Sequence, residues 1–216
     1  NVASATRHGL MVLGPAGSGK TRLLDTLCRA EGHRMHRIHL PSLSTTQLYG
    51  GFDLTTGEWA DGTLPQFFRQ EAAHTPAEGE LTWLVLDGPC GVIHMDGFHQ
   101  VLNERKMLTC ANNERLPLPP HVKVLLECHT TDTQHMSMAT MSPLGINIIA
   151  ADDVGWRAQL ASGLQRPELR TLSGAVAQRL EDQMVEVLGF CEKYFAEPRL
   201  EAQVVASVLA LLAALL

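Results

Sequence analysis

The chain has 216 residues, of which 45% are hydrophobic and 19% charged, and its formal net charge is −6. This composition is that of a globular protein with a substantial core, and the acidic balance argues against nucleic-acid binding through a broad basic surface. The five cysteines are widely spaced and form no C-x-x-C pair, which favours reduced thiols over a disulfide or zinc framework.

The first strong signal is a strand, a glycine-rich turn and a helix in succession. An apolar run at Leu10–Leu13 precedes a segment that satisfies G-x-x-x-x-G-K-[ST], and a helix is predicted over Lys20–Ala30. The turn and the first helical turn would aim backbone N–H groups at a phosphate, while Lys20 would neutralise the outer phosphates and Thr21 would hold Mg²⁺. The predicted phosphate-binding residues are Gly14, Pro15, Ala16, Gly17, Ser18, Gly19, Lys20 and Thr21.

A short strand is expected over residues 35–40, and it includes two of three regularly spaced histidines. A strand would place such residues on alternating faces, and no carboxylate or cysteine lies at ligand spacing, so we do not expect a metal site here. Ser44 is expected to cap a short helix that ends at residues 50–51, a hairpin is expected over 54–62, and a helix over 65–73.

The second strong signal is the apolar run at residues 81–87, which predicts a strand buried on both faces of a parallel sheet. Its last residue is Asp87, which we expect to help hold Mg²⁺ at the carboxyl end of the sheet, together with Thr21. The next residue is Gly88, where a hydrolysing ring ATPase would carry a glutamate as base for the attacking water. The site is therefore expected to bind ATP and to cleave it poorly, and we assign no catalytic residue.

The remaining elements complete a doubly wound parallel α/β sheet. They are a helix over 92–105, a hairpin over 106–118, a strand over 122–127, a polar segment at 129–134 that could sense a γ-phosphate, a short helix or turn at 137–141 and a strand over 146–149. We expect the nucleotide-binding domain to comprise residues 1–152. A helical domain, truncated at its C-terminus, is expected over residues 153–216.

The helical domain is dominated by an amphipathic stretch over residues 172–194. Its expected core-facing residues are Val176, Leu180, Met184, Val187, Leu188 and Cys191. The last apolar stretch, residues 204–216, is shorter than the roughly 20 residues that a membrane span needs, so we read it as a buried helix cut off by the end of a fragment and expect no membrane contact.

Several further segments resemble one AAA+ module of a dynein heavy chain, most closely the second of its six modules. The segments that carry the resemblance are Arg7-His8-Gly9 before the phosphate loop, Gln47-Leu48-Tyr49-Gly50-x-Phe52-Asp53, Glu58-Trp59-x-Asp61-Gly62, the strand from Trp83 to Gly88, and Glu114-Arg115-Leu116-x-Leu118-x-Pro120. The resemblance implies a P-loop NTPase (AAA+) sheet followed by a helical subdomain, with ATP or ADP and Mg²⁺ as ligands. It also implies a microtubule motor of the cytoplasm, cytoskeleton or cilium.

The same resemblance implies partners for the module. These are the neighbouring AAA+ modules and the linker of the same heavy chain, with intermediate chains, light chains and microtubules bound through other parts. The hairpins around Thr56-Gly57 and Asn112-Asn113 would be inserts that contact the linker. The second module is known for holding ATP as a structural ligand.

One residue departs from the family pattern. Pro143 stands where the family has an arginine finger, and proline carries no charge to offer a neighbouring phosphate, so another arginine, with Arg157 the nearest, would have to substitute. Two alternatives remain open at this stage. A small-molecule kinase would use Arg166, Arg170 and Arg179 in a lid, and a degenerate scaffold module would no longer bind nucleotide.

Overall fold

The computed structural model describes residues 8–150, 153, 155–165, 169, 174–194 and 200–215. The chain divides into two compact units. The first comprises the chain up to Leu13 together with Lys20–Ile148, and the second comprises Gly14–Gly19 together with the chain from Ile149 onward.

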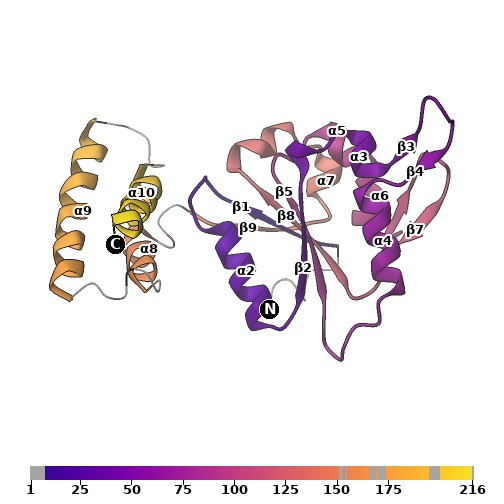
Figure 1. Ribbon diagram of the computed structural model, residues 1–216. Helices are drawn as coiled ribbons and strands as arrows, with labels where there is room; N and C mark the ends of the chain where they lie inside the picture. The colour runs from indigo at the N-terminus through magenta and orange to yellow at the C-terminus, as the bar shows by residue number, and fades with distance from the viewer. Residues whose placement is uncertain are drawn as a thin grey trace. The chain divides into compact units, whose positions relative to one another are not determined.

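A five-stranded parallel sheet forms the centre of the first unit (Figure 1). Its order is β2-β5-β8-β1-β9, so the first strand of the chain lies between the last two. The strands are β1 (Leu10–Leu13), β2 (Arg34–His39), β5 (Thr82–Asp87), β8 (Val122–Cys128) and β9 (Gly145–Ile148). Every pairing in this sheet is parallel, which confirms the predicted α/β fold.

The two faces of the sheet are covered differently (Figure 1). Helix α2 (Lys20–Ala30) lies on one face and buries Leu24 and Cys28. The other face holds the larger core, to which α3 (Thr45–Tyr49), α4 (Thr63–Ala73) and the segment 92–102 contribute. Ser44 caps α3 through a reciprocal capping box with Gln47, as its sequence predicted.

The predicted single helix over residues 92–105 is wrong, because three short pieces replace it. These are α5 (Val92–Met95), η2 (Asp96–Phe98) and α6 (His99–Leu102). The break coincides with a contact from a residue far away in the sequence: the Tyr49 hydroxyl donates to the His94 carbonyl, and a Cβ at Gly97 would lie 2.9 Å from the Tyr49 ring. The tyrosine thus hydrogen-bonds to a backbone carbonyl of this segment, and its ring packs against Gly97, where a larger residue would not fit. Met95, Phe98, Val101 and Leu102 are nevertheless buried, so the predicted core face holds for these four.

Two antiparallel hairpins and several short turns complete the first unit. The hairpins pair β3 (Gly51–Phe52) with β4 (Trp59–Ala60) and β6 (Met107–Thr109) with β7 (Arg115–Pro117). The second confirms the hairpin predicted over 106–118, whereas the first strand of the other hairpin lies before the predicted range of 54–62. The remaining pieces are η1 (Leu40–Ser42), η3 (Thr130–His135) and α7 (Met138–Met141). The four cysteines that the structure describes here, Cys28, Cys90, Cys110 and Cys128, are free thiols.

The helices of the second unit are α8 (Gly155–Leu164), α9 (Gly174–Tyr194) and α10 (Leu200–Leu215). Met184 and Leu188 of α9 enter their shared core with Val205 and Leu209 of α10. The prediction placed too many residues of α9 in the core, because the side chains of Val176 and Val187 are 41% and 46% exposed. A single row at a spacing of four suffices to contact two neighbouring helices. Leu180 is partly buried, and the Cys191 side chain lies outside the described residues.

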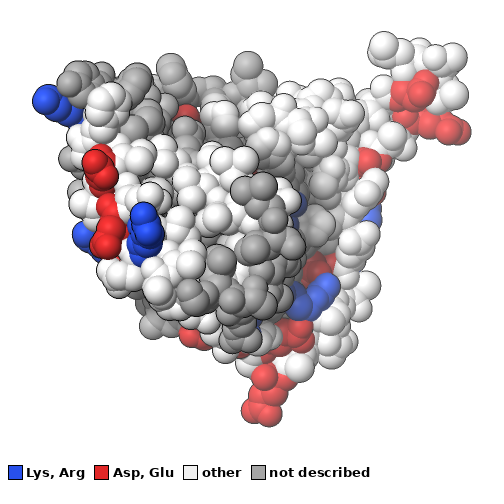
Figure 2. Space-filling view, turned by 60° about the vertical axis from the view of Figure 1, so that its left-hand side comes forward, with Lys and Arg blue, Asp and Glu red and all other residues white. Residues whose placement is uncertain are grey.

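Among the described helices, none is long and apolar enough to cross a membrane. On the face drawn in Figure 2, acidic and basic side chains of described residues are few and interspersed over an uncharged surface.

Candidate functional site

The register of the sheet brings two carboxylates together where the strands end. Asp87 on β5 pairs with Glu127 on β8, and His39 on β2 pairs with Asp87. Paired residues on adjacent strands project to the same face, and here that face is the one under α2. Val12 pairs with Glu127 from the other side, so Glu127 lies between the strand that leads to the glycine-rich loop and the strand that ends in Asp87.

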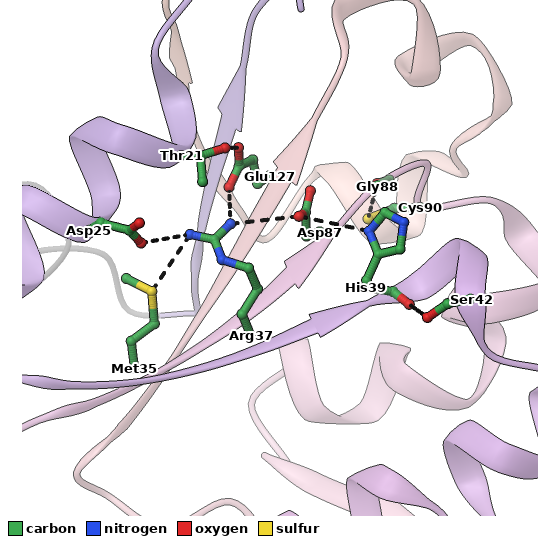
Figure 3. A network of polar contacts seen from close by, with 10 residues as sticks. All are labelled: Thr21, Asp25, Met35, Arg37, His39, Ser42, Asp87, Gly88, Cys90 and Glu127. Carbon is green, nitrogen blue, oxygen red and sulfur yellow. Dashed lines mark hydrogen bonds and ion pairs between the residues drawn. The ribbon is translucent and has the colours of Figure 1, made fainter. Parts of the chain in front are cut away.

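Glu127 links the start of α2 to β2 through its two carboxylate oxygens (Figure 3). One carboxylate oxygen accepts a hydrogen bond from the Thr21 hydroxyl, and the other accepts one from the Arg37 guanidinium. The Glu127 side chain is only 4% exposed. A carboxylate with so little water must be satisfied by such partners, because leaving it buried and unpaired would be very costly.

Arg37 extends this network to two further carboxylates (Figure 3). Its guanidinium lies 3.0 Å from an Asp25 oxygen and 3.7 Å from an Asp87 oxygen. Burial by itself would lower the pKa of Arg37, but the hydrogen bonds to Glu127 and Asp25 outweigh it and raise that pKa. Asp87 also lies 3.8 Å from His39, whose side chain is 60% exposed.

Lys20 begins α2 and faces the same charges. Burial lowers the pKa of its ammonium group, and the negative charges of Glu127 and Asp87 oppose that shift. The edge therefore holds Lys20 and Arg37 against the carboxylates Asp25, Asp87 and Glu127. When all five are ionised, one negative charge remains in excess, which favours the approach of a cation.

The glycine-rich loop has its own geometry. Gly17 and Gly19 adopt positive φ angles of 81° and 88°, and the Ser18 N–H donates to the Pro15 carbonyl at 3.3 Å. Within the same unit, the Gln159 amide donates to the Gly17 carbonyl at 3.3 Å. Ser18 is 2% exposed, and among the described residues its hydroxyl has no hydrogen-bond partner. A buried hydroxyl without a partner fits a loop whose polar groups await a ligand.

The donor set also fits magnesium. Thr21, Asp87 and Glu127 offer hydroxyl and carboxylate oxygens, which Mg²⁺ prefers, and Mg²⁺ usually keeps waters and phosphate oxygens as its other ligands. Within the described part of the chain, no three His, Cys, Asp or Glu side chains are grouped to hold a metal unaided. His36 stacks on Phe67 at 4.8 Å between ring centroids, whereas His39 lies near Asp87 on the opposite face, so these two histidines do alternate as expected.

A family model described as "AAA domain (dynein-related subfamily)" matches residues 9–144, which include the loop, the residues of the carboxyl edge and four of the five strands of the sheet. The chain belongs to the dynein-related AAA domain family.

This AAA domain has relatives among axonemal and flagellar dynein heavy chains. It is 35% identical to dynein axonemal heavy chain 8 of Homo sapiens over 168 residues, or 76% of this chain. It is also 35% identical to dynein axonemal heavy chain 5 of Rattus norvegicus over 74% of this chain. The match to the dynein-1-alpha heavy chain of the flagellar inner arm I1 complex of Chlamydomonas reinhardtii is 34% over 88% of this chain. The matched region spans only 4% to 5% of the length of these relatives.

The residue after Asp87 is fixed in the AAA domain by its backbone. Gly88 has φ of 113°, and a Cβ at this position would lie 2.6 Å from Cδ of Pro41. A side chain is therefore disfavoured here by both backbone conformation and space. The backbone conformation after β5 therefore favours glycine over glutamate at position 88.

The segment around Pro143 is described, but nothing in it replaces an arginine finger directly. Ser142 and Pro143 line a cavity of about 670 Å³ whose only cation among its described lining residues is Arg105. Arg157 instead lies 3.4 Å from Glu181 and stacks over Trp156. The substitution by Arg157 thus stays a prediction. Of the arginines considered for a kinase lid, Arg166 and Arg170 lie outside the described residues, and Arg179 is exposed on α9.

Sequence reasoning missed Glu127, Arg37 and Asp25. Glu127 alone had a signal, a charged residue near the end of an apolar strand, which is the signal that singled out Asp87. It could not be used because the sequence does not say that β8 lies between β1 and β5. The expected sensor segment at residues 129–134 forms η3, where Asp132 accepts from the His129 N–H at 2.8 Å in a local cap.

Proposed function

We propose that this AAA domain binds ATP or ADP with Mg²⁺. The phosphate-binding residues would be Gly14, Pro15, Ala16, Gly17, Ser18, Gly19, Lys20 and Thr21, with Thr21 and Asp87 on the metal side. The observation that carries the proposal is the carboxyl edge of the sheet. Thr21 and Lys20 begin α2 directly after the loop, and the carboxylate cluster lies beside them with negative charge in excess.

Each group has a separate part in this proposal. Backbone N–H groups of the loop would bind the phosphate oxygens, and Lys20 would neutralise them. Bound Mg²⁺ would neutralise the charge of the phosphates and link them to the protein. Thr21 would offer its hydroxyl oxygen to the metal shell, and Asp87 would bind that shell from β5.

Hydrolysis at this site should be slow. A general base must reach the attacking water, and Gly88 provides none at the position after Asp87, where a side chain would meet Pro41. Pro143 bears on a different site, because an arginine at this position would have reached the phosphates of a neighbouring module. We therefore propose a ligand that stays bound and stabilises the fold, most like the second module of a dynein ring.

The relatives suggest the setting. We propose that residues 1–152 form the large AAA+ subdomain and residues 153–216 part of the small helical one. Neighbouring modules and the linker of the same heavy chain would be the partners, within a microtubule motor of the cilium or flagellum that also has intermediate and light chains. The names of the relatives support this setting, because they are axonemal and flagellar heavy chains.

The test is the nucleotide content of the purified full-length protein. The protein is denatured and the released nucleotide identified, for the natural chain and for Lys20→Ala. We expect Lys20→Ala to lose about one nucleotide per chain, since the lysine contacts the phosphates. Lys123→Ala is the matched control, because it removes the same charge from β8 at four residues before Glu127. Equal content in all three proteins, with equal binding of a fluorescent ATP analogue, would exclude the site.

Identification of the nucleotide separates the remaining possibilities. Intact ATP lost with Lys20→Ala supports a structural ligand. ADP with turnover that disappears in Lys20→Ala means an active ATPase whose base comes from elsewhere. An empty site in the natural protein favours a degenerate scaffold module.

A further inference from the structure

We propose that Glu127, rather than Asp87, is the positioning residue that orients the Thr21 hydroxyl toward Mg²⁺, and that Arg37 holds Glu127 in place for this task. The inference rests on the proposed function, because it concerns how the same site holds its metal. It assigns a task to two residues that the glycine-rich loop motif does not include.

The direction of one hydrogen bond carries the first step. A hydroxyl has one hydrogen and two lone pairs, and a metal ion can be ligated only by a lone pair. Thr21 donates its hydrogen to Glu127. An acceptor fixed at that point therefore turns the lone pairs of Thr21 away from Glu127 and leaves them for a cation.

The second step is that Glu127 is held firmly enough to act as such an acceptor. Its second oxygen is bound by Arg37, and the side chain is 4% exposed, so little water competes for either oxygen. Arg37 is in turn fixed by Asp25 at 3.0 Å. This gives a continuous series of contacts from Asp25 through Arg37 and Glu127 to Thr21, visible in Figure 3.

The third step concerns Asp87, which has other contacts. Its carboxylate lies near Arg37 at 3.7 Å and near His39 at 3.8 Å, and its side chain is 30% exposed. Such a carboxylate remains accessible to the waters of a metal shell. The two acidic residues thus have different roles. Glu127 orients the Thr21 hydroxyl, and Asp87 faces the hydrated ion.

Arg37 also supplies a positive charge between Glu127 and Asp87 before the metal arrives. Adjacent carboxylates in register repel each other, and a guanidinium shared between them offsets that repulsion. The shared guanidinium thus lets the two carboxylates lie close together before a cation binds.

The experiment measures nucleotide affinity with and without Mg²⁺ in the full-length protein. Binding of a fluorescent ATP analogue is titrated in Mg²⁺ and in EDTA, and the signal of this site is the part that Lys20→Ala removes. The quantity of interest is the ratio of the two affinities. We expect Glu127→Gln to reduce this ratio about tenfold, as is typical when a residue that orients a metal ligand is changed, with little effect on the affinity in EDTA.

Glu71→Gln is the matched control. Glu71 is also buried and also bonds to a threonine and an arginine, Thr82 and Arg34, but at the other edge of the sheet. It should leave the Mg²⁺ ratio unchanged. An unchanged ratio in Glu127→Gln, with nucleotide still bound, would overturn the inference and leave the proposed function standing. Absence of nucleotide from the natural protein would overturn both.

A double-mutant cycle tests whether Glu127 acts through Thr21. Thr21→Val removes the hydroxyl, whereas Thr21→Ser keeps it. If Glu127 orients that hydroxyl, Glu127→Gln should reduce the Mg²⁺ ratio in the natural and Thr21→Ser proteins, and should change it less than twofold in Thr21→Val. Independent and additive effects in the Thr21→Val protein would contradict the assignment, because Glu127 would then act on the metal by another route.

Discussion

Two similar clusters lie at opposite edges of the same sheet. At the carboxyl edge, Glu127 bonds to Thr21 and Arg37. At the amino edge, Glu71 of α4 accepts from the Thr82 hydroxyl at 2.8 Å and pairs with Arg34 at 3.2 Å. Both arginines come from β2 and both glutamates are buried, so the local chemistry of the two clusters is nearly the same.

The clusters differ in what surrounds them. Glu71 is the one carboxylate of the amino-edge cluster, and His121 adds a third partner at 3.1 Å. Burial would raise the pKa of Glu71, but the hydrogen bonds from Thr82 and His121 and the charge of Arg34 outweigh it and lower that pKa. At the carboxyl edge, Arg37 must serve Asp25, Asp87 and Glu127 together. In the amino-edge cluster the single carboxylate is fully paired, and the cluster stabilises the fold. The carboxyl-edge cluster has one negative charge in excess, which a bound cation could neutralise.

The largest effect on stability should come from the backbone beside the carboxyl-edge cluster. We expect Gly88→Ala to lower the free energy of unfolding by about 3 kcal/mol, because an alanine must adopt a positive φ and also displace Pro41. Chemical denaturation of the chain, followed by the fluorescence of buried Trp83, would measure it. Gly32→Ala is the control, since Gly32 also has a positive φ, of 69°, but a Cβ there would meet no atom within 4 Å. It should cost about 1 kcal/mol, and equal costs would mean that Pro41 can move aside.

The next effect separates the two glutamates. Glu71→Gln should lower the free energy of unfolding by about 2 kcal/mol, because it removes the buried charge on which Arg34 and His121 depend. Glu127→Gln should cost less than about 1 kcal/mol, since losing one of three carboxylates relieves repulsion and offsets the lost bonds. The same denaturation experiment compares them. A larger cost for Glu127→Gln would make the carboxyl-edge cluster a structural one.

The smallest effect is the pH dependence of the amino-edge cluster. The pKa of Glu71 is lowered by folding from a reference value of 4.5, so its contribution is fully present above that pH. This contribution to stability is lost as the pH falls below 4.5 and through the lower pKa that Glu71 has in the folded protein. Between pH about 6 and pH about 3, the natural chain should therefore lose more stability than Glu71→Gln, by up to about 1 kcal/mol. Parallel losses in the two proteins would show that Glu71 titrates alike when folded and unfolded.

The sequence by itself determined the elements that local chemistry governs. The apolar runs of β1, β5 and β8, the Ser44 cap, both hairpins and the loop motif could all be found from residue types and their spacing, because these patterns depend on neighbours in the chain. Lys20, Thr21 and Asp87 were named for the same reason. The single helix expected over residues 92–105 failed where a distant residue, Tyr49, intervened at His94 and Gly97.

Only the tertiary structure decided which charged residues meet. Glu127 ends an apolar run and Glu71 lies in an amphipathic helix, and neither sequence context shows which threonine the glutamate will contact. The order β2-β5-β8-β1-β9 places the end of β8 next to the strand that leads to the loop, and brings Arg37 across from β2. Strand order is set by which faces bury the most apolar surface across the whole sheet, so it cannot be read from any one segment.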